Sequence, residues 1–202
     1  VSTDIFSTMN LSFTRGDEEA AVRENYRRLA RALGAEVGQF VCSDQTHTVN
    51  VRRVTAADAG KGLTRERDYR DVDGLITDEP GLVLSTFYAD CVPLYLVDPV
   101  HRAIGMSHSG WRGTAARMGA VTLSAMQEAY GTRPEDVVCA VGPSICRDCY
   151  EVSADVADIF AEEFPGHEQE ILAESEKNSV GMAHADKKYQ LDLWKANEII
   201  FQ

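Results

Sequence analysis

The residues of this chain that could do chemistry gather in one stretch, from residue 81 to residue 114. Asp90 and Cys91 are adjacent there, and His108 follows between small residues. A Gly-Trp-Arg-Gly turn at 110–113 then opens a predicted helix. A thiolate and an imidazole are zinc ligands and are also the reactive groups of covalent catalysis. The stretch therefore predicts a metal site, or at least a reactive thiol and imidazole.

A second histidine could complete a set of metal ligands. His47 lies at the junction of two strand-like runs, 39–43 and 48–54, and a neutral imidazole offers a lone pair to a metal. With Cys91 and His108 it would form a Cys/His/His set, which leaves the fourth tetrahedral position of zinc open for water, as in catalytic sites. The spacings of 44 and 17 residues match no short ligand motif. The three side chains would have to meet through the fold.

Other uses of the cysteines stay open on the residues alone. Cys91 could be a covalent nucleophile with His108 as its base, or it could be an inert core thiol. Cys146 and Cys149 form a C-x-x-C pair that could act in redox chemistry or bind a metal. A cytidine-deaminase signature is excluded, because no H-x-E occurs in the chain and Ser144, not a cysteine, follows Pro143.

The turn at 110–113 adds a possible anion site. Arg112 offers a planar fork of donors beside two glycines and next to the positive end of the predicted helix. Together these groups could hold a phosphate. The alternative is that Arg112 forms an ordinary salt bridge while Trp111 fills the core.

Composition limits the class of protein. A chain of 202 residues with 44% hydrophobic residues can bury one core, so we expect a single domain over residues 1–202. A net charge of -12 disfavours nucleic acid and anionic membranes as partners, and no apolar run approaches the roughly 20 residues of a membrane span. Five cysteines, an odd number, suit a reducing cytoplasm. A non-enzymatic module that binds through its acidic surface would explain the charge but not the clustered Cys, His and Arg.

Apolar runs predict the elements that position these groups. We expect buried strands at 82–87, 92–97 and 103–106, which place Cys91 between the first two and His108 at the end of the third. The irregular order of strands and helices favours a mixed sheet with helices outside it. Further predictions are strands at 5–13, 39–43, 48–54, 75–77 and 137–141; helices at 17–33, 114–130, 153–164 and 191–201; and polar surface segments at 56–71 and 165–185.

Ten short motifs occur in order along the chain. They are 7–11 (STMNL), 16–17 (GD), 25–28 (NYRR), 45–47 (QTH), 73–77 (DGLIT), 89–93 (ADCVP), 108–114 (HSGWRGT), 142–145 (GPSI), 149–152 (CYEV) and 191–194 (LDLW). In this combination they resemble the motifs of the laccase-domain or YfiH-like family. Members of that family were once described as copper-dependent polyphenol oxidases. They are now regarded as zinc-dependent enzymes that combine phosphorolysis of adenosine, inosine, guanosine and methylthioadenosine with deamination of adenosine.

The resemblance implies a fold and a ligand set. The fold is α+β, a layered α-β-β-α sandwich of mixed sheets. His47, Cys91 and His108 are the implied zinc ligands, with copper as the alternative metal. The family usually continues past residue 202 with a Cys-containing segment and a Phe-Ser-Tyr-Arg motif, so we expect that a C-terminal segment is missing. The family's equivalent of Met9 is commonly Leu.

The resemblance also suggests roles around the metal. Asn10, Arg15 and Gln45 match positions expected near the nucleoside or the phosphate. Arg15 and Arg112 are the candidates to hold the anion in phosphorolysis. Asp90 is the candidate proton carrier in deamination, where zinc would activate water for attack on C6 of adenine. Purine nucleosides and phosphate are therefore the expected partners. A copper-dependent polyphenol oxidase, or a cysteine hydrolase using Cys91 and His108, remains the alternative.

Overall fold

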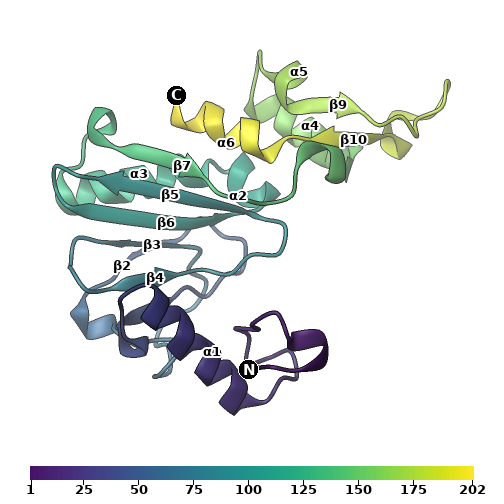
Figure 1. Ribbon diagram of the computed structural model, residues 1–202. Coiled ribbons are helices and arrows are strands. Elements are labelled where there is room, and N and C mark those ends of the chain that lie inside the picture. Colours follow the sequence, from purple (N-terminus) through teal and green to yellow (C-terminus); the bar gives the residue numbers. More distant parts are fainter.

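The computed structural model describes residues 1–202 as an α+β fold built in layers around a five-stranded mixed sheet (Figure 1). The strand order of this central sheet is β2-β3-β6-β5-β7. β2 and β3 are parallel, and every other neighbouring pair is antiparallel. The strands are β2 (Val51–Arg53), β3 (Gly74–Thr77), β5 (Val92–Asp98), β6 (Ala103–Ser109) and β7 (Val138–Val141).

One face of the central sheet is covered by the helices α2 (Trp111–Ala115), α3 (Met118–Tyr130) and α6 (Leu193–Phe201). Side chains alternate between the faces of a strand, and Leu94 and Leu96 of β5 join the helices in the largest apolar core. Gly105 in β6 lets α3 approach closely, because a Cβ there would lie 3.0 Å from the Met126 sulfur.

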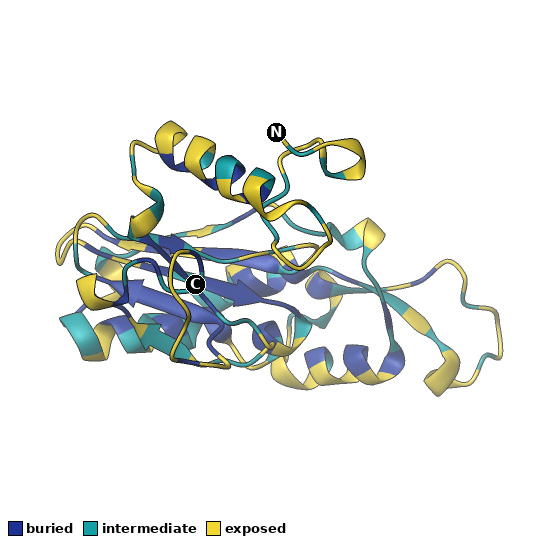
Figure 2. Cartoon of the chain, turned by 90° about the horizontal axis from the view of Figure 1, so that it is seen from below, coloured by how far each residue is buried: buried dark blue, intermediate teal, exposed yellow.

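The opposite face carries a second, smaller sheet. Its parallel strands β1 (Phe40–Cys42) and β4 (Val83–Ser85) contribute Val41 and Leu84 to a core shared with Leu75 of β3. Beyond them lies α1 (Glu19–Ala32), whose Val22, Tyr26 and Ala30 pack on Phe40 and Cys42. Figure 2 shows the buried residues along the central strands and the exposed residues on the outer sides of the helices. The layered α-β-β-α prediction is confirmed.

A third sheet extends the molecule at one side (Figure 1). Its antiparallel strands β8 (Glu151–Ser153), β10 (Lys188–Leu191) and β9 (Leu172–Glu174) pack with the helices α4 (Ala154–Glu163) and α5 (Glu168–Ile171). Six short 3-10 turns complete the chain: η1 (Asp4–Phe6), η2 (Val37–Gln39), η3 (Ala56–Asp58), η4 (Pro134–Asp136), η5 (Arg147–Cys149) and η6 (His184–Asp186). No helix has both the length and the apolar character that crossing a membrane requires.

Several predicted elements are corrected. The segment 5–13 is not a strand: η1 begins it, Ile5 is 86% exposed, and no strand lies beside it. The helix predicted at 114–130 is two helices, because Arg117 adopts a left-handed conformation with φ of 57° between α2 and α3. Residues 188–191 form β10, and the last helix begins after Asp192, whose carboxylate accepts the Lys195 N–H.

Two burial predictions are also corrected. β5 and β7 are not fully buried: Tyr95, Val97 and Val138 are exposed, because the two-stranded β1–β4 sheet packs over β3 and β6 and leaves this part of the outer face open. The segment 165–185 contains α5 and β9 rather than only loop, since Ile171 is buried and Leu172 pairs with Leu191 of β10.

Candidate metal centre

Strand directions bring three distant side chains to one end of the central sheet. β3 and β5 both run antiparallel to β6, so the starts of β3 and β5 lie beside the end of β6. Cys91 directly precedes β5, and His108 is the next-to-last residue of β6. His47 comes from the loop before β2, which is parallel to β3. The ligand atoms of His47, Cys91 and His108 all lie within 4.8 Å of one another, so the three predicted ligands are brought together.

The spacing of these atoms fits a zinc ion. Cys91 Sγ and His47 Nε2 are 3.8 Å apart. In a tetrahedral zinc site with Zn–S of about 2.3 Å and Zn–N of about 2.1 Å, a sulfur and a nitrogen ligand are about 3.6 Å apart. One sulfur and two imidazole nitrogens are also the donors that zinc prefers. The residues present therefore fit the metal that the resemblance implies.

A glycine makes room for the cluster. The β5–β6 register pairs Val92 with Ser109, which places Gly110 next to Cys91. A Cβ at Gly110 would lie 2.7 Å from Cys91 Sγ and 3.2 Å from His47 Cδ2. Any side chain at position 110 would displace Cys91 and crowd the ring of His47.

A buried carboxylate, Asp73, organises two of the ligands. It directly precedes β3, is fully buried, and its Oδ1 lies 2.8 Å from His108 Nδ1. Because this hydrogen bond uses Nδ1, Nε2 is the nitrogen of His108 that could bind a metal. A carboxylate on the other ring nitrogen is common for metal-binding histidines. The same carboxylate accepts the backbone N–H groups of Thr46, His47 and Thr48. Asp73 thus fixes the orientation of His108 and the shape of the loop that carries His47.

The backbone of His47 is held in an unfavourable conformation. Its φ of 65° is in the left-handed region, which costs a residue with a Cβ free energy unless its surroundings impose it. The bonds from this loop to Asp73 supply that constraint. The consequence is an exposed imidazole held beside Cys91.

The pKa values of Asp73 and His108 are shifted by the hydrogen bond between them. Burial opposes ionisation of Asp73, but hydrogen bonds from His108 and Thr48 outweigh it and hold the pKa of Asp73 at about 2. Burial also opposes the imidazolium of His108, but hydrogen bonds with Asp73 and Cys91 outweigh it and raise the pKa of His108 to about 9. A metal that binds His108 must therefore displace a proton that the metal-free protein retains at neutral pH.

An open hollow of about 560 Å³ lies over the cluster. Gln45 and Asp90, both predicted from the sequence, line it together with the three ligands. Asp90 is exposed, and its side chain has no hydrogen-bond partner in the protein. The complete lining is Ser43, Asp44, Gln45, His47, Arg67, Phe87, Ala89, Asp90, Cys91 and His108.

Three other predicted residues do not line this hollow. Asn10 bonds to Asp17 and Ser12 and accepts an N–H from Asn25, which ties the N-terminal segment to α1. Arg15 is exposed. Arg112 is exposed and stacks on Trp111, with its guanidinium carbon 4.3 Å from the ring centroid, and it forms no salt bridge. α2 has only five residues, so it offers little of the helix dipole on which the phosphate hypothesis depended.

Sequence reasoning missed three residues at the site: Asp73, Phe87 and Arg67. The sequence does show an Asp-Gly pair before a buried strand, but nothing local says that this carboxylate meets His108. Arg67 pairs with Asp44 at 2.6 Å and donates to the Ser43 carbonyl. It lies in a segment, 56–71, expected to be only a polar surface excursion, which is instead held down by a buried ion pair between Asp58 and Lys61.

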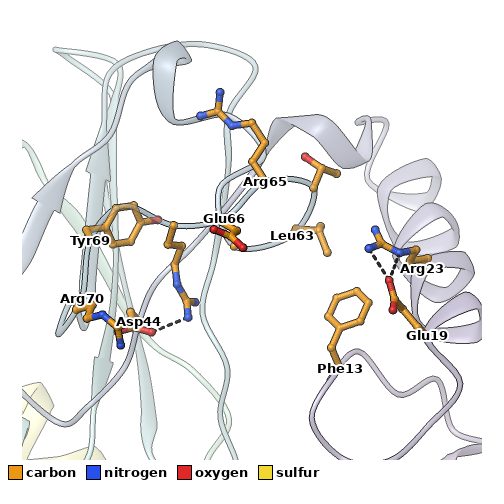
Figure 3. A pocket seen from close by; sticks show the side chains of 12 residues that line it. Phe13, Glu19, Arg23, Asp44, Leu63, Arg65, Glu66, Tyr69 and Arg70 are labelled. Atoms are coloured by element: carbon orange, nitrogen blue, oxygen red, sulfur yellow. Dashed lines mark hydrogen bonds and ion pairs between the residues drawn. The ribbon is translucent and has the colours of Figure 1, made fainter.

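Arg67 and Asp44 also line a second hollow of about 680 Å³ (Figure 3). Figure 3 shows Glu19 and Arg23 of α1 on one side of it and Glu66 on the other. Four arginines line it, and two of these, Arg23 and Arg67, are paired with carboxylates. The Asp44–Arg67 ion pair therefore belongs to the lining of both hollows.

The C-x-x-C pair does not match a thioredoxin-like site. Cys146 and Cys149 are free thiols at a 3-10 turn that leads into β8, whereas a thioredoxin-like pair requires a helix directly after it.

Comparisons with known proteins agree with this architecture. The model of a family described as multi-copper polyphenol oxidoreductase laccase matches residues 1–202. The purine nucleoside phosphorylase YlmD of Bacillus subtilis is 33% identical over 99% of the chain and 69% of its own length. The adenosine deaminase RL5 of an unknown prokaryotic organism is 35% identical over 77% of the chain and 59% of its own length. A crystal structure of the hypothetical protein YfiH from Bacillus licheniformis superposes with a TM-score of 0.86 at 30% identity, covering 99% of this chain and 72% of that one.

Proposed function

Because this chain belongs to the multi-copper polyphenol oxidoreductase laccase family, we propose from the names of its relatives that it is an enzyme of purine nucleosides. Its reactions are phosphorolysis of adenosine, inosine, guanosine and methylthioadenosine, and deamination of adenosine. The observation that carries the proposal is the Cys/His/His cluster at the floor of an open hollow large enough for a nucleoside.

The metal of this proposal is zinc. His47, Cys91 and His108 would hold it, and zinc would supply positive charge that activates water and stabilises developing anions. A Cys/His/His set also occurs in blue-copper sites, which add a distant axial methionine. No methionine lines this hollow, and the structure contains one such cluster, which supports a single zinc rather than several coppers.

Phosphorolysis forms a bond from a phosphate oxygen to C1′ of the ribose and breaks the bond from C1′ to the purine nitrogen. The phosphate needs a positive group near that carbon. Arg15 and Arg112 were expected for this purpose, but Arg67 is the one arginine or lysine that lines the hollow. We therefore add Arg67 as the first candidate to hold the anion. Three of its N–H groups remain beyond its bonds to Asp44 and Ser43.

Deamination requires a group that moves a proton between water and the leaving amine. Asp90 is suited to this step, since its unpaired carboxylate lines the same hollow as the three ligands. Asp44 lines the hollow too but is held by Arg67 and by the Asp71 N–H. Asp90→Asn should therefore abolish most adenosine deamination while zinc binding is kept.

The test of the proposal is incubation of zinc-loaded protein with inosine, with and without phosphate. We expect hypoxanthine and ribose 1-phosphate only when phosphate is present. Hypoxanthine formed equally without phosphate would indicate a hydrolase. Copper-dependent oxidation of phenols in the absence of nucleoside turnover would support the oxidase, and labelling of Cys91 by an electrophile in zinc-loaded protein would support the cysteine hydrolase. The cytoplasmic location stays a prediction from composition.

A further inference from the structure

Phe87 is an exposed aromatic side chain in the lining of the hollow over the Cys/His/His cluster. It lies between the end of β4 at Ser85 and the ligand Cys91. Its side chain is 42% exposed although it belongs to the lining of the hollow. It is also the one aromatic residue in that lining apart from the histidine ligands. This apolar ring is open to water beside the three candidate ligands, so it offers a flat surface to a molecule that binds in the hollow.

The backbone of Phe87 is clamped by one side chain. Gln45 Nε2 donates to the Phe87 carbonyl at 2.6 Å, and Gln45 Oε1 accepts the Phe87 N–H at 2.7 Å. The same oxygen accepts the Ser43 hydroxyl at 2.9 Å. Both lone pairs of the oxygen and one amide hydrogen are therefore in use, which leaves a single N–H of Gln45 for any ligand. The Gln45 amide bonds the N–H and the carbonyl of Phe87 as the backbone of a paired strand would. It thus fixes the backbone of a residue 42 positions away in sequence.

We propose that the ring of Phe87 is the surface on which the purine base stacks, and that Gln45 is a positioning residue that holds this ring. This inference rests on the proposed function and changes one part of it, since Gln45 was expected to contact the substrate. Stacking depends on the π face that every base has, so it tolerates changes in the base. A phenylalanine platform has no polar group that would distinguish adenine from hypoxanthine or guanine, which suits an enzyme that accepts all three.

Two other aromatic side chains near the cluster, Tyr88 and Trp111, are less free for this role. The Tyr88 hydroxyl lies 2.6 Å from Thr86 Oγ1 and donates to the Ser107 carbonyl, and its ring packs 5.6 Å from His108. One face of Trp111 is covered by Arg112. Phe87 is left as the ring that both lines the hollow and is open to solvent.

The first experiment measures affinity separately from turnover. Calorimetry should give the affinity for hypoxanthine, and steady-state kinetics should give kcat and KM for inosine. Phe87→Ala should weaken hypoxanthine binding and raise KM by about 5- to 100-fold, the range expected for loss of one stacked base, with zinc content unchanged and a much smaller change in kcat. Phe87→Tyr should restore most of the affinity and Phe87→Leu only part of it. Phe13→Ala is the matched control, because Phe13 is 38% exposed but lies outside this hollow.

The second experiment is a double-mutant cycle between Gln45 and Phe87. If Gln45 acts through Phe87, Gln45→Ala should raise KM in the wild-type background and have little further effect in the Phe87→Ala background. If Gln45 contacts the substrate directly, its effect should be undiminished when Phe87 is absent. That second outcome would overturn the assignment of Gln45 as a positioning residue.

The outcomes separate the inference from the proposed function. Inosine phosphorolysis with an unchanged KM and base affinity in Phe87→Ala would overturn the stacking role while the proposed function stood. Hypoxanthine binding that depends on Phe87, without any nucleoside turnover, would support the stacking role and contradict the proposed function. No measurable binding of hypoxanthine to the wild-type protein would overturn the inference, and if a phenol bound through Phe87 instead, the platform would belong to the oxidase alternative.

Discussion

At the scale of single residues, the buried carboxylate of Asp73 serves two of the three proposed metal ligands at once. It holds the ring of His108 through Nδ1 and the left-handed backbone of His47 through the N–H groups of the loop. A single side chain thus connects two segments that are 61 residues apart along the chain. The ligands could be predicted from residue type and family motifs, but Asp73 could not, because its role depends on a register between β3 and β6 that no local pattern shows.

Asp73→Asn should lower zinc affinity by roughly 10- to 100-fold, because the amide is a weaker acceptor for the His108 ring and cannot serve all its present donors. A competition titration with a zinc chelator would measure this. Asp98→Asn is the matched control: Asp98 is also fully buried and also bonds a histidine Nδ1, that of His101, but it lies at the opposite end of β5 from the cluster and outside its hollow. Equal losses of zinc affinity in both variants would contradict the role of Asp73.

Gly110→Ala should also weaken zinc binding. Its new Cβ would come 2.7 Å from Cys91 Sγ, so the thiolate must move away from the two imidazoles. Gly113→Ala should bind zinc normally, because its nearest contact would be 3.5 Å and it lies in α2. Zinc content after dialysis against metal-free buffer compares the two variants. Full occupancy in Gly110→Ala would show that the cluster tolerates more space than its packing suggests.

At the scale of elements, strand register and helix docking decide where the ligands stand. β6 carries His108, and its last residue, Ser109, joins a buried polar group with Thr114 of α2 and Asn197 of α6. This group attaches two helices to the strand that ends at the Cys/His/His cluster. The sequence predicted these helices from apolar spacing, but it did not predict the break at Arg117, since the tertiary contacts of Arg117, a hydrogen bond to the Glu163 carbonyl and stacking on Phe164, are not visible in a local pattern. The false strand at 5–13 failed for a related reason: alternation of side chains does not supply a partner strand.

Asn197→Ala should destabilise the fold by about 1–3 kcal/mol, because it removes the bonds from Asn197 to Thr114 and to the Leu193 carbonyl inside a buried site. Urea unfolding followed by circular dichroism would measure the free energy at an unchanged m-value. Glu198→Ala, one position further along α6 and exposed, should change stability by less than about 0.5 kcal/mol. An unchanged free energy of unfolding in Asn197→Ala would mean that α6 docks through its apolar face alone.

Acid should weaken the turn between β5 and β6. Burial opposes ionisation of Asp98, but the nearby Thr132 hydroxyl and the hydrogen bonds with His101 outweigh it and hold the pKa at about 2. A carboxyl with a depressed pKa stabilises the fold fully above its unfolded value near 3.9, and this stability is lost as the pH falls toward 2. The wild-type protein should therefore lose more stability between pH 5 and pH 3 than Asp98→Asn does. The free energy of unfolding of both proteins should be measured as a function of pH. Equal losses between pH 5 and pH 3 would show that Asp98 does not contribute.

At the scale of the whole molecule, the α-β-β-α layers form a rigid frame that opens at one end of the central sheet. The layered fold could be predicted from the family motifs. Two residues of the lining could not be predicted, because Arg67 and Phe87 come from segments whose local patterns indicate only a surface segment and a strand. Both residues have proposed roles only because the fold brings their segments together in the lining of one hollow.

The central claim is that His47, Cys91 and His108 hold one zinc ion at this end of the sheet. Diffraction from crystals of the zinc-loaded protein, recorded on both sides of the zinc absorption edge, tests it directly. The account predicts one strong anomalous peak, about 2.3 Å from Cys91 Sγ and about 2.1 Å from one nitrogen of each histidine. A peak at Cys146 and Cys149 instead, or imidazoles turned away from Cys91 with no peak between them, would contradict it.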